Sequence, residues 1–443
     1  MPGRYYIETY GCQMNVRDSE TIAGQLEALG FEPAARAEDA DVIVLNTCSV
    51  RERPHHKVYS RLGVLGRLKR RRPDLVIALC GCMAQIVGDR VAERTPFVDI
   101  ILGPRNVGRF AEALAAALAS RRCTILRDTT ECVPEGLPAR RHPGLSAFVN
   151  VSYGCDNFCA YCIVPYARGR EVSREPQAIL AEIESAVAAG YREIILLGQN
   201  VNSYGRTLTP RITFADLLAM INAIPAVQRI RFITSHPKDC SEELLRAMAE
   251  LDKVCEHLHL PLQAGDDEVL ARMGRGYTYE HYRTIVRRAR ELMPDIAITT
   301  DLMVGFPGET EEQFRCTLRA VEELRFDQAF MFKYDDRPGT RAEAMAEKVP
   351  EPEKLDRLAR LISLQNRLAR EINEAQVGRE FEVLVEEVDE KRPGYVRGRT
   401  RQNKVMVFAG DRELVGQVVR VRAIKGHMWG FQGTIVGHQS VPF

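Results

Sequence analysis

Short apolar runs alternate with helical patterns along most of the chain, and this alternation constrains the fold more than any other feature. After residue 145, a helical pattern follows each of six such runs, which lie at 147–153, 193–198, 229–235, 257–263, 297–306 and 328–334. Repeated units of one strand and one helix predict a parallel barrel or partial barrel. In such a barrel the active groups lie at the carboxyl ends of the strands.

The first 120 residues repeat this alternation on a smaller scale. Apolar runs at 5–10, 42–46 and 75–79 each end shortly before a cysteine, and helical patterns lie at 18–30, 52–69 and 105–119. This order predicts a parallel sheet with helices on its faces, where ligands gather at the carboxyl ends of the strands. We therefore expect the three cysteines, Cys12, Cys48 and Cys82, to converge on one crevice. Cys80 would point the same way as Cys82 along an extended segment, so it is the alternative to Cys82.

A different pattern begins after a long polar helix predicted at 352–375. The runs EFEVLVEEV, GYVRGRT, KVMVFAG, LVGQVVRVRAI and GFQGTIVG are strand-like and separated by glycines and charged turns, with no helical pattern between them. They predict a small all-β barrel of about five strands, similar in kind to oligonucleotide-binding barrels.

These patterns divide the chain into three domains within an α/β fold class. We predict a parallel-sheet α/β domain at 1–120, a linker at 121–145, a central partial (β/α) barrel at 146–375 and an all-β barrel at 376–443. The linker is marked by ARRHPGL, which combines Pro, Gly and basic residues.

Composition narrows the environment and the class of partner. The net charge is +1, so any surface for a polyanion must be a local patch. No run approaches the roughly 18 apolar residues of a membrane span, and the first residues lack the apolar core of a signal peptide. We expect a cytoplasmic, monomeric protein that makes no contact with a membrane. Twelve cysteines in that compartment favour metal binding or catalysis over disulfides.

Three of the cysteines are bunched in GCDNFCAYC at 154–162. Cys155, Cys159 and Cys162 have C-x3-C-x2-C spacing. Three thiolates cannot complete a four-coordinate structural zinc site, but they can bind three irons of a [4Fe–4S] cluster. The fourth iron would then be open to a substrate or cofactor. The alternatives are three buried apolar thiols, or a zinc knuckle whose fourth ligand is elsewhere.

The same segment resembles the signature of radical S-adenosylmethionine enzymes, in which an aromatic residue precedes the last cysteine. Tyr161 has that position here. The resemblance implies that the open iron binds the amino and carboxylate groups of S-adenosylmethionine, and that an electron from the cluster cleaves it to a 5′-deoxyadenosyl radical. It also implies that Tyr161 lies near the adenine.

The resemblance extends along essentially the whole chain to the methylthiotransferase family. YGCQMNVRDSE, LNTCSVRE and GCMAQ resemble the three cysteine segments of that family's N-terminal domain, and LLGQNVNSYG, RFITSHP, LHLPLQAG and GFPGETEEQF follow in its order. The family resemblance implies that Cys12, Cys48 and Cys82 ligate a second [4Fe–4S] cluster, which carries the inserted sulfur. Without it, each lone cysteine would be interpreted as a packing residue. The C-terminal module resembles the TRAM domain, an RNA-binding barrel.

Within the family, QMN after Cys12 and LLGQNVNSYG resemble the branch that makes 2-methylthio-N6-isopentenyladenosine in tRNA. This implies a methylthio group added at C2 of the adenosine next to the anticodon (position 37), with two molecules of S-adenosylmethionine per product. The implied partners are the tRNA anticodon stem-loop, an external electron donor and a sulfur source. The alternatives are the branches acting on threonylcarbamoyladenosine tRNA or on a ribosomal-protein aspartate. A further alternative is a non-catalytic iron–sulfur protein for RNA binding or electron transfer.

Polar residues at the predicted strand ends are candidates for cofactor contact, because ligands gather there in barrels. They are Gly198, Gln199 and Asn200 after the second strand, Ser235 and His236 after the third, Gln263 after the fourth, and GFPGE at 305–309. Strand-end turns and backbone caps are the alternative interpretation.

Two basic segments are candidates for contact with RNA. Arg168 and Arg170 follow the cysteine loop and could meet tRNA phosphates or a cofactor carboxylate, or could pair with Glu171. RGRTRQNK at 397–404 has aromatic residues nearby, and this combination suits phosphate neutralisation with base stacking.

Overall fold

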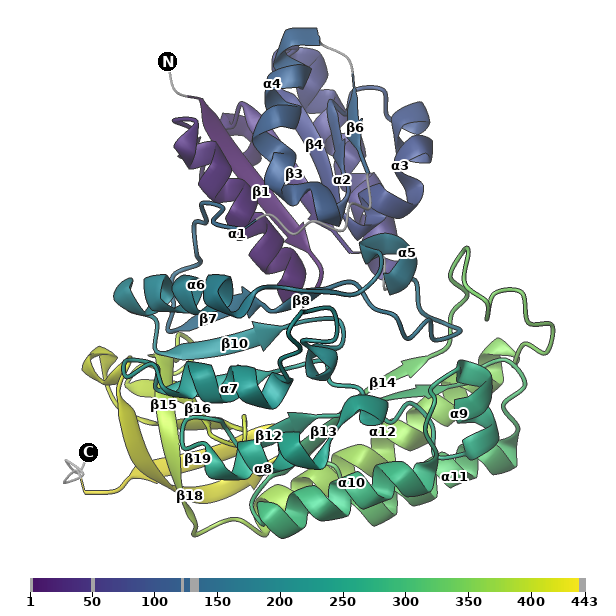
Figure 1. The fold of residues 1–443 in the computed structure, drawn as a ribbon, viewed down its shortest axis with the longest axis vertical. Coiled ribbons are helices and arrows are strands. Elements are labelled where there is room, and N and C mark those ends of the chain that lie inside the picture. Colours follow the sequence, from purple (N-terminus) through teal and green to yellow (C-terminus); the bar gives the residue numbers. More distant parts are fainter. Residues whose placement is uncertain (1–2, 49–51, 121–122, 128–134, 438–443) are drawn as a thin grey trace.

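The computed structural model describes residues 3–48, 52–120, 123–127 and 135–437. The chain forms three units that follow one another in sequence (Figure 1). An N-terminal sheet domain lies above a central barrel in this view, and a small β-barrel lies beside the central barrel at the lower left. The predicted fold class is confirmed.

The N-terminal domain is a six-stranded parallel sheet in the order β2-β1-β3-β4-β5-β6. The strands are β1 (Arg4–Tyr10), β2 (Glu32–Pro33), β3 (Val42–Thr47), β4 (Val76–Gly81), β5 (Ile100–Leu102) and β6 (Thr124–Leu126). The helices are α1 (Gln13–Ala28), α2 (Glu52–Arg71), α3 (Cys82–Arg94) and α4 (Phe110–Ser120), with short 3-10 turns η1 (Ala37–Asp39) and η2 (Pro104–Arg109).

Two apolar layers enclose this sheet, which explains the continuous apolar runs. All residues of β3 and β4 are buried, as expected for parallel strands covered on both faces. One layer gathers around Ile22 and Phe110 from α1 and α4, and the other around Leu62 and Met83 from α2 and α3. β6 pairs with β5, so the sheet continues past residue 120 into the range predicted as a linker.

The central unit is a partial barrel of six parallel strands. They are β7 (Ser146–Asn150), β10 (Glu193–Leu197), β11 (Arg229–Phe232), β12 (His257–His259), β13 (Ala297–Val304) and β14 (Gln328–Lys333). Two three-stranded sheets, β11-β10-β7 and β12-β13-β14, are joined where Cys255 N donates to Ile230 O at 3.0 Å. The six predicted strands are therefore all present.

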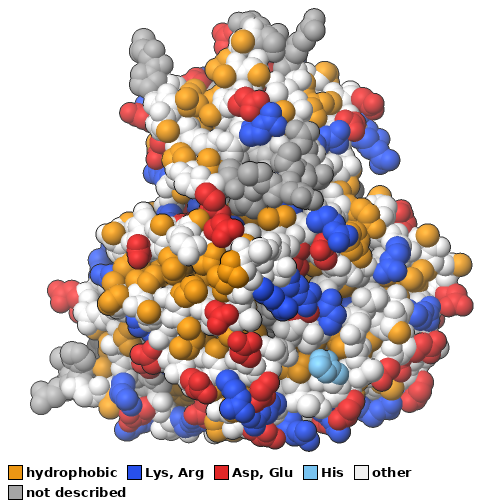
Figure 2. Space-filling model, in the orientation of Figure 1, with side chains coloured by type: hydrophobic (Ala, Val, Ile, Leu, Met, Phe, Trp, Pro, Cys, Tyr) orange, Lys and Arg blue, Asp and Glu red, His pale blue; other side chains and the backbone are white. Residues whose placement is uncertain are grey.

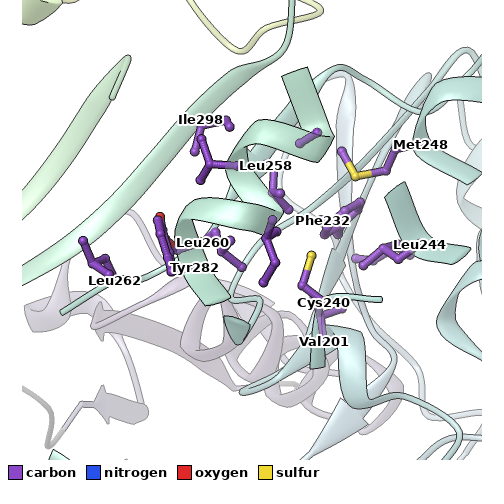
Figure 3. Packing of buried hydrophobic residues seen from close by; sticks show 14 of the residues in the cluster. Val201, Phe232, Cys240, Leu244, Met248, Leu258, Leu260, Leu262, Tyr282 and Ile298 are labelled. Atoms are coloured by element: carbon purple, nitrogen blue, oxygen red, sulfur yellow. The ribbon is translucent and has the colours of Figure 1, made fainter. Parts of the chain in front are cut away.

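Helices cover the outside of the barrel and leave the strand ends free for loops. They are α6 (Pro176–Ala188), α7 (Phe214–Asn222), α8 (Glu242–Glu250), α9 (Asp267–Met273), α10 (Tyr279–Leu292) and α11 (Glu311–Leu324), with short 3-10 turns η3 (Val201–Ser203) and η4 (Pro237–Asp239). Figure 3 shows the core between these helices and the strands. Tyr282 reaches into that core, where its hydroxyl donates to Leu260 O at 2.7 Å. This bond satisfies the one polar group that the ring brings inside.

A small antiparallel pair frames the cysteine loop. β8 (Ser152–Tyr153) pairs with β9 (Val172–Ser173), and the segment between them contains the three bunched cysteines and α5 (Val164–Arg168). Figure 1 shows α5 at the boundary between the N-terminal domain and the central barrel. The loop therefore faces both domains.

The helix α12 (Glu351–Glu374) leads into the C-terminal unit, a closed five-stranded barrel. Its strands, in the order β15-β16-β17-β19-β18, are β15 (Glu380–Val388), β16 (Tyr395–Thr400), β17 (Val405–Ala409), β18 (Val418–His427) and β19 (Gly430–Ile435), with a short turn η5 (Arg412–Leu414). Closure removes the exposed strand edges that a small open sheet would have. The predicted all-β barrel is confirmed.

Arginines of β11 attach this barrel to the central one. The side chain of Arg229 is 1% exposed, and its Nη1 donates to Arg399 O at 2.7 Å. Arg231 Nη2 donates to Thr400 O at 2.7 Å. Both acceptors are backbone carbonyls of β16, and Arg229 Nη2 also pairs with the Glu382 side chain at 3.0 Å, so main chain and side chain of the barrel both take part in the contact.

The basic run at 397–404 lies in this seam. Arg401 pairs with Glu256 at 2.7 Å, and Lys404, which is 7% exposed, pairs with Asp327 at 2.6 Å. The predicted RNA contact is therefore wrong for these two residues. Their charges attach one domain to another, and a buried ammonium cannot neutralise an RNA phosphate.

Among the helices within the described ranges, none combines the length and the apolar character needed to cross a membrane. Figure 2 shows basic and acidic side chains interspersed over the visible face. This agrees with a net charge of +1.

Candidate cluster and cofactor site

The three bunched cysteines lie in the loop between β8 and β9, close to the carboxyl end of β7. The loop turns at Gly154, whose φ is 75°, and a Cβ there would lie 2.0 Å from Arg170 O. Only glycine fits such a position. Farther along, Ala160 N donates to Met273 O and Ala160 O accepts from Ala342 N, both at 2.8 Å. Two distant segments of the barrel thus fix the loop.

The three thiols act on one another and receive hydrogen bonds. Burial, with a smaller contribution from Cys159, raises the pKa of Cys155 to about 11 and that of Cys162 to about 12. Cys162 Sγ accepts from Val164 N at 3.4 Å, and Cys159 Sγ accepts from Arg275 Nη1 at 3.2 Å. Such donors suit thiolates, which form when iron displaces the protons. The donor set fits three ligands of an iron–sulfur cluster.

Arg275 was not predicted as a site residue. It is 5% exposed and follows α9, and besides Cys159 it donates to Tyr277 OH at 3.1 Å and to Tyr161 OH at 3.4 Å. Burial raises the pKa of Tyr161, against the opposing charge of Arg275. No periodic pattern marks this arginine in RMGRGYT. Only the fold brings it to a cysteine 116 residues away.

Within the described part of the chain, no three His, Cys, Asp or Glu side chains surround a single point as the ligands of one metal ion do. A [4Fe–4S] cluster binds each thiolate through a different iron, so its ligands need not meet at one point. The absence of such a group among the described residues is therefore compatible with the predicted cluster ligands.

Buried polar atoms without partners gather at the ends of β7, β10 and β11. They are Asn150 Oδ1, Ser152 Oγ, Gln199 Oε1, Asn200 Oδ1, Ser235 Oγ and His236 Nε2. Buried polar groups in folded proteins are nearly always hydrogen-bonded. Six unsatisfied atoms at neighbouring strand ends therefore indicate a polar ligand. S-adenosylmethionine, with its carboxylate, amine and ribose hydroxyls, offers the matching donors and acceptors.

Gly198 ends β10 in close contact with β8. A Cβ at this position would lie 2.6 Å from Ser152 Oγ. Next to it, Asn200 Nδ2 donates to Asp239 Oδ2 at 2.6 Å, while Gln199 Nε2 contacts Met14 Sδ of α1. The predicted residues 198–200 thus lie where the central barrel meets the N-terminal domain.

His236 is held as a neutral donor. Burial, with the charge of Arg275 adding to it, lowers the pKa of His236 to about 2. Its Nδ1 accepts from Lys238 N at 3.2 Å, so the proton of the neutral ring lies on the unpartnered Nε2. Asn202, which was not predicted, exchanges bonds of 2.8 and 3.0 Å with the backbone of His236. These bonds join the loops after β10 and β11.

Gln263 lies beyond β12 in a left-handed conformation with φ of 72°. Its N–H donates to Asp301 O at 2.9 Å, and its side chain is buried. A non-glycine residue in this region carries strain that is common at functional sites. Its contact with the cofactor remains a prediction.

The structure brings Cys12, Cys48 and Cys82 to the same edge of the N-terminal sheet, after β1, β3 and β4. Cys12 is the N-cap of α1, and Cys82 begins α3. Cys48 N donates to Tyr10 O at 2.7 Å, and a Cβ on Gly11 would lie 3.0 Å from Cys48 Cβ. Burial raises the pKa of Cys82, and Cys12 adds to that shift. The three cysteines therefore lie at one edge of the sheet, and a shared cluster remains a prediction.

Cys80 points into the core instead. It is fully buried in the apolar layer that also contains Val44 and Ile22. The argument from strand alternation was wrong, because Gly81, with φ of 91°, ends the strand between the two cysteines. Cys82 therefore belongs to the following helix.

Arg168 and Arg170 lie in different environments. Arg168 Nη2 pairs with Asp18 Oδ2 of α1 at 2.9 Å, and both side chains are 4% exposed. Arg170 is exposed and pairs with Asp156 at 3.0 Å. Arg168 therefore pairs with Asp18 instead of Glu171, and its burial at the domain boundary argues against the predicted contact with tRNA phosphates. The predicted contact with a cofactor carboxylate remains a prediction.

Three family models match the chain. They are the Radical SAM superfamily at residues 149–321, the uncharacterized protein family UPF0004 at 4–103 and the TRAM domain at 374–436. Their order is the order of the three structural units. The radical SAM match implies a [4Fe–4S] cluster and S-adenosylmethionine in the central barrel.

Solved structures share the fold at low identity. The radical S-adenosylmethionine methyltransferase TsrM from Kitasatospora setae has a TM-score of 0.55 at 18% identity, covering 74% of this chain and 72% of that chain. The cobalamin-dependent enzyme OxsB has a TM-score of 0.51 at 13% identity, covering 81% and 56%. These two comparisons concern the fold alone.

Curated relatives match nearly end to end. The tRNA-2-methylthio-N(6)-dimethylallyladenosine synthase of Syntrophomonas wolfei is 49% identical over 98% of this chain and 98% of its own length. The synthase of the same name from Moorella thermoacetica is also 49% identical, over the same shares of both chains. The resemblance predicted from the motifs is confirmed. The chain belongs to the family of these synthases, within the radical SAM superfamily.

Proposed function

We propose that the chain is a radical methylthiotransferase that adds a methylthio group to C2 of N6-isopentenyladenosine (N6-dimethylallyladenosine) at position 37 of tRNA, next to the anticodon. The observation that carries the proposal is the pair of facing cysteine sets. Cys155, Cys159 and Cys162 lie at the barrel mouth, and three further cysteines lie at the facing sheet edge. The names of the relatives supply the substrate.

Cys12, Cys48 and Cys82 would hold a second [4Fe–4S] cluster in this proposal. The chemistry of the donor set supports it, since the three thiols follow neighbouring strands at one sheet edge and the charge of Cys12 acts on Cys82. When bound, the barrel cluster supplies the electron that cleaves S-adenosylmethionine, and the second cluster supplies the sulfur.

The residues of the chain bind and orient the cofactor. Neutral His236 offers an Nε2–H donor, and Ser235 and Asn200 offer acceptors at neighbouring strand ends. Tyr161, held by Arg275, would lie against the adenine. Because these groups are fixed by the barrel before the ligand arrives, binding does not need to reorganise them.

The substrate base must leave its stack to reach a site buried between two domains. Unstacking costs least in a single-stranded loop, which favours an anticodon loop over a duplex. An external electron donor and a sulfur source complete the proposed set of partners, and we propose that the enzyme acts as a monomer in the cytoplasm.

Nucleoside mass spectrometry tests the proposal. The protein is purified without oxygen, its clusters are rebuilt, and it is given S-adenosylmethionine, a reductant and tRNA bearing isopentenyladenosine, with threonylcarbamoyladenosine tRNA in parallel. We expect a methylthio mass gain on the isopentenyl nucleoside only. A gain on the other tRNA alone would move the substrate and keep the chemistry. No gain on either, with intact clusters and with S-adenosylmethionine left uncleaved, would favour the non-catalytic alternative.

A matched pair of cysteine variants connects activity to the site. Cys159→Ala should abolish 5′-deoxyadenosine formation, because it removes one cluster ligand. Cys316→Ala is the control, since Cys316 lies in α11 beside Arg319, on the outside of the barrel. Persistent cleavage by Cys159→Ala would contradict the assignment of the cluster loop.

A further inference from the structure

One arginine connects the two cysteine sets. Arg168 is the last residue of α5, six positions after Cys162, and its side chain leaves the central domain to contact α1. Nη2 pairs with Asp18 at 2.9 Å, and α5 packs on α3, the helix that begins at Cys82, so the charge of Cys82 acts on the guanidinium. A side chain that starts beside one cluster loop therefore ends against a ligand of the other.

The charge of Arg168 acts on the N-terminal cysteines. It lowers the pKa of Cys82 against the larger effect of burial, and Asp18, Cys82 and Cys12 together raise the pKa of Arg168 despite its own burial. Nη1 of Arg168 is buried and has no hydrogen-bond partner among the described residues. Thiolates accept hydrogen bonds better than thiols do, so this donor suits the loaded site.

The backbone around Arg168 is held from the opposite side. Arg105, in η2 of the N-terminal domain, donates through Nε to Arg168 O at 2.7 Å and through Nη2 to Arg170 O. One arginine from each domain thus reaches across the same boundary. This double contact holds α5 against the N-terminal domain, where α5 also packs on α3.

We propose that Arg168 is a positioning residue that holds the two cysteine sets at a fixed separation and stabilises the N-terminal cluster through Cys82. The inference rests on the proposed function, because it requires a cluster at Cys12, Cys48 and Cys82. Reduction adds negative charge to a cluster, and a buried cation with N–H donors near sulfur favours the reduced state. Arg168 therefore raises the midpoint potential of that cluster.

The test isolates the N-terminal cluster in the full-length chain. The parent carries Cys155→Ala, Cys159→Ala and Cys162→Ala, so that any reconstituted cluster lies in the N-terminal domain. Iron content, the midpoint potential from a titration followed by electron paramagnetic resonance, and the rate of iron loss to a chelator are measured. A parent that holds no cluster would overturn the two-cluster assignment itself, and this inference with it.

Arg168→Gln in this parent should move the midpoint to lower potential and speed iron loss by about tenfold, the lower end of what outer partners of metal ligands contribute. Arg170→Gln is the matched control, because Arg170 is two positions away, exposed and paired only across the loop surface. The role of Arg168 would be overturned if Arg168→Gln changed neither the midpoint potential nor the rate of iron loss, or if Arg170→Gln changed them equally. Either result would leave the two-cluster assignment intact.

Asp18→Asn separates an electrostatic role from a structural one. It removes the anion of the pair and leaves the cation beside Cys82, so the midpoint should move to higher potential, opposite to Arg168→Gln. Arg168→Lys keeps the charge and should restore part of the midpoint. Near-ultraviolet circular dichroism checks that each variant folds. If Arg168→Gln does not fold, the midpoints of Arg168→Lys and Asp18→Asn are compared with that of the parent. If Arg168→Lys and Asp18→Asn both lowered the midpoint potential, the effect would come from a loosened domain boundary, and the proposal would be overturned.

Discussion

At the residue scale, single buried side chains donate hydrogen bonds to the cysteine sulfurs of the cluster loop, and Arg275 is the clearest case. Its Nη1 lies 3.2 Å from Cys159 Sγ. We expect Arg275→Gln to lower the midpoint potential of the barrel cluster and to slow cleavage of S-adenosylmethionine by about tenfold or more, since donors to ligand sulfur favour the reduced cluster. The measurements are a redox titration and the rate of 5′-deoxyadenosine formation. Arg246→Gln, on the exposed face of α8, should change neither.

The residue scale also shows which candidates the sequence could suggest. Cys155, Cys159 and Cys162 are recognisable because eight consecutive positions carry all three. Arg168 and Arg275 were misread or missed, because their partners lie 150 and 116 positions away. The spacing of residues in the sequence does not reveal contacts between residues so far apart.

Turns at strand ends decide the cofactor site at the element scale. A Cβ on Gly198 would lie 2.6 Å from Ser152 Oγ and 3.2 Å from Val201 Cα. Gly198→Ala must therefore displace the end of β10, where the cofactor is expected to bind. A loss of about 1.4 kcal/mol in binding free energy corresponds to a tenfold rise in Kd. We expect the Kd for S-adenosylmethionine to rise about tenfold, measured by equilibrium dialysis with reconstituted protein. Gly63→Ala, where nothing lies within 4 Å, is the control and should bind normally.

Element boundaries differ from the predictions where polar residues are buried. α1 begins at Gln13 rather than at Asp18. The sequence does not predict its first turn as helix, because Asn15 and Arg17 are polar. Both are nevertheless buried, Asn15 against β3 and Arg17 against Glu182 of the central domain. Hydrophobic periodicity detects a helix that faces an apolar core, as α1 does from Ile22 onward, whereas its first turns face Glu182 and the cysteine edge. Long apolar runs such as β3 were predicted well, because burial on both faces requires a continuous apolar sequence.

The seam between barrels governs stability at the scale of the whole molecule. Arg231 pairs with Glu193 at 2.6 Å, with both side chains 5% exposed or less, and also donates to β16 carbonyls. Arg231→Met leaves Glu193 buried without its cation, which costs about 3–5 kcal/mol. Urea unfolding should show this loss, and limited proteolysis should release the C-terminal barrel. The exposed pair of Arg379 and Asp295 is the control, since Arg379→Met should cost at most about 1 kcal/mol.

The stability of the boundary between the N-terminal and central domains should fall at acidic pH. Burial raises the pKa of Glu182, but Arg17, Arg174 and Arg141 lower it more, to about 2. A folded pKa below the ordinary value of 4.5 means that Glu182 stabilises the fold above about pH 5 and loses this contribution as pH falls from 4.5 toward 2. The loss is of order 3 kcal/mol at 1.36 kcal/mol per unit.

Thermal unfolding of the metal-free chain between pH 6 and pH 3 measures this effect. Glu182→Gln should be less stable at pH 6 and should show a shallower fall in acid. A variant as acid-sensitive as the unsubstituted chain would mean that another carboxylate is responsible.

The sequence alone predicted the order of the three units, the partial barrel and the bunched cysteines at 155–162, because periodicity and close spacing are local properties. The role of Cys12, Cys48 and Cys82 came from the family resemblance. The tertiary structure decided which distant groups meet. It placed Cys80 in the core, Arg401 and Lys404 in the seam between the barrels, and Arg168 between the two cysteine sets. The physical reason is that burial and ion pairing depend on what lies across a domain boundary, and a linear pattern does not contain that boundary.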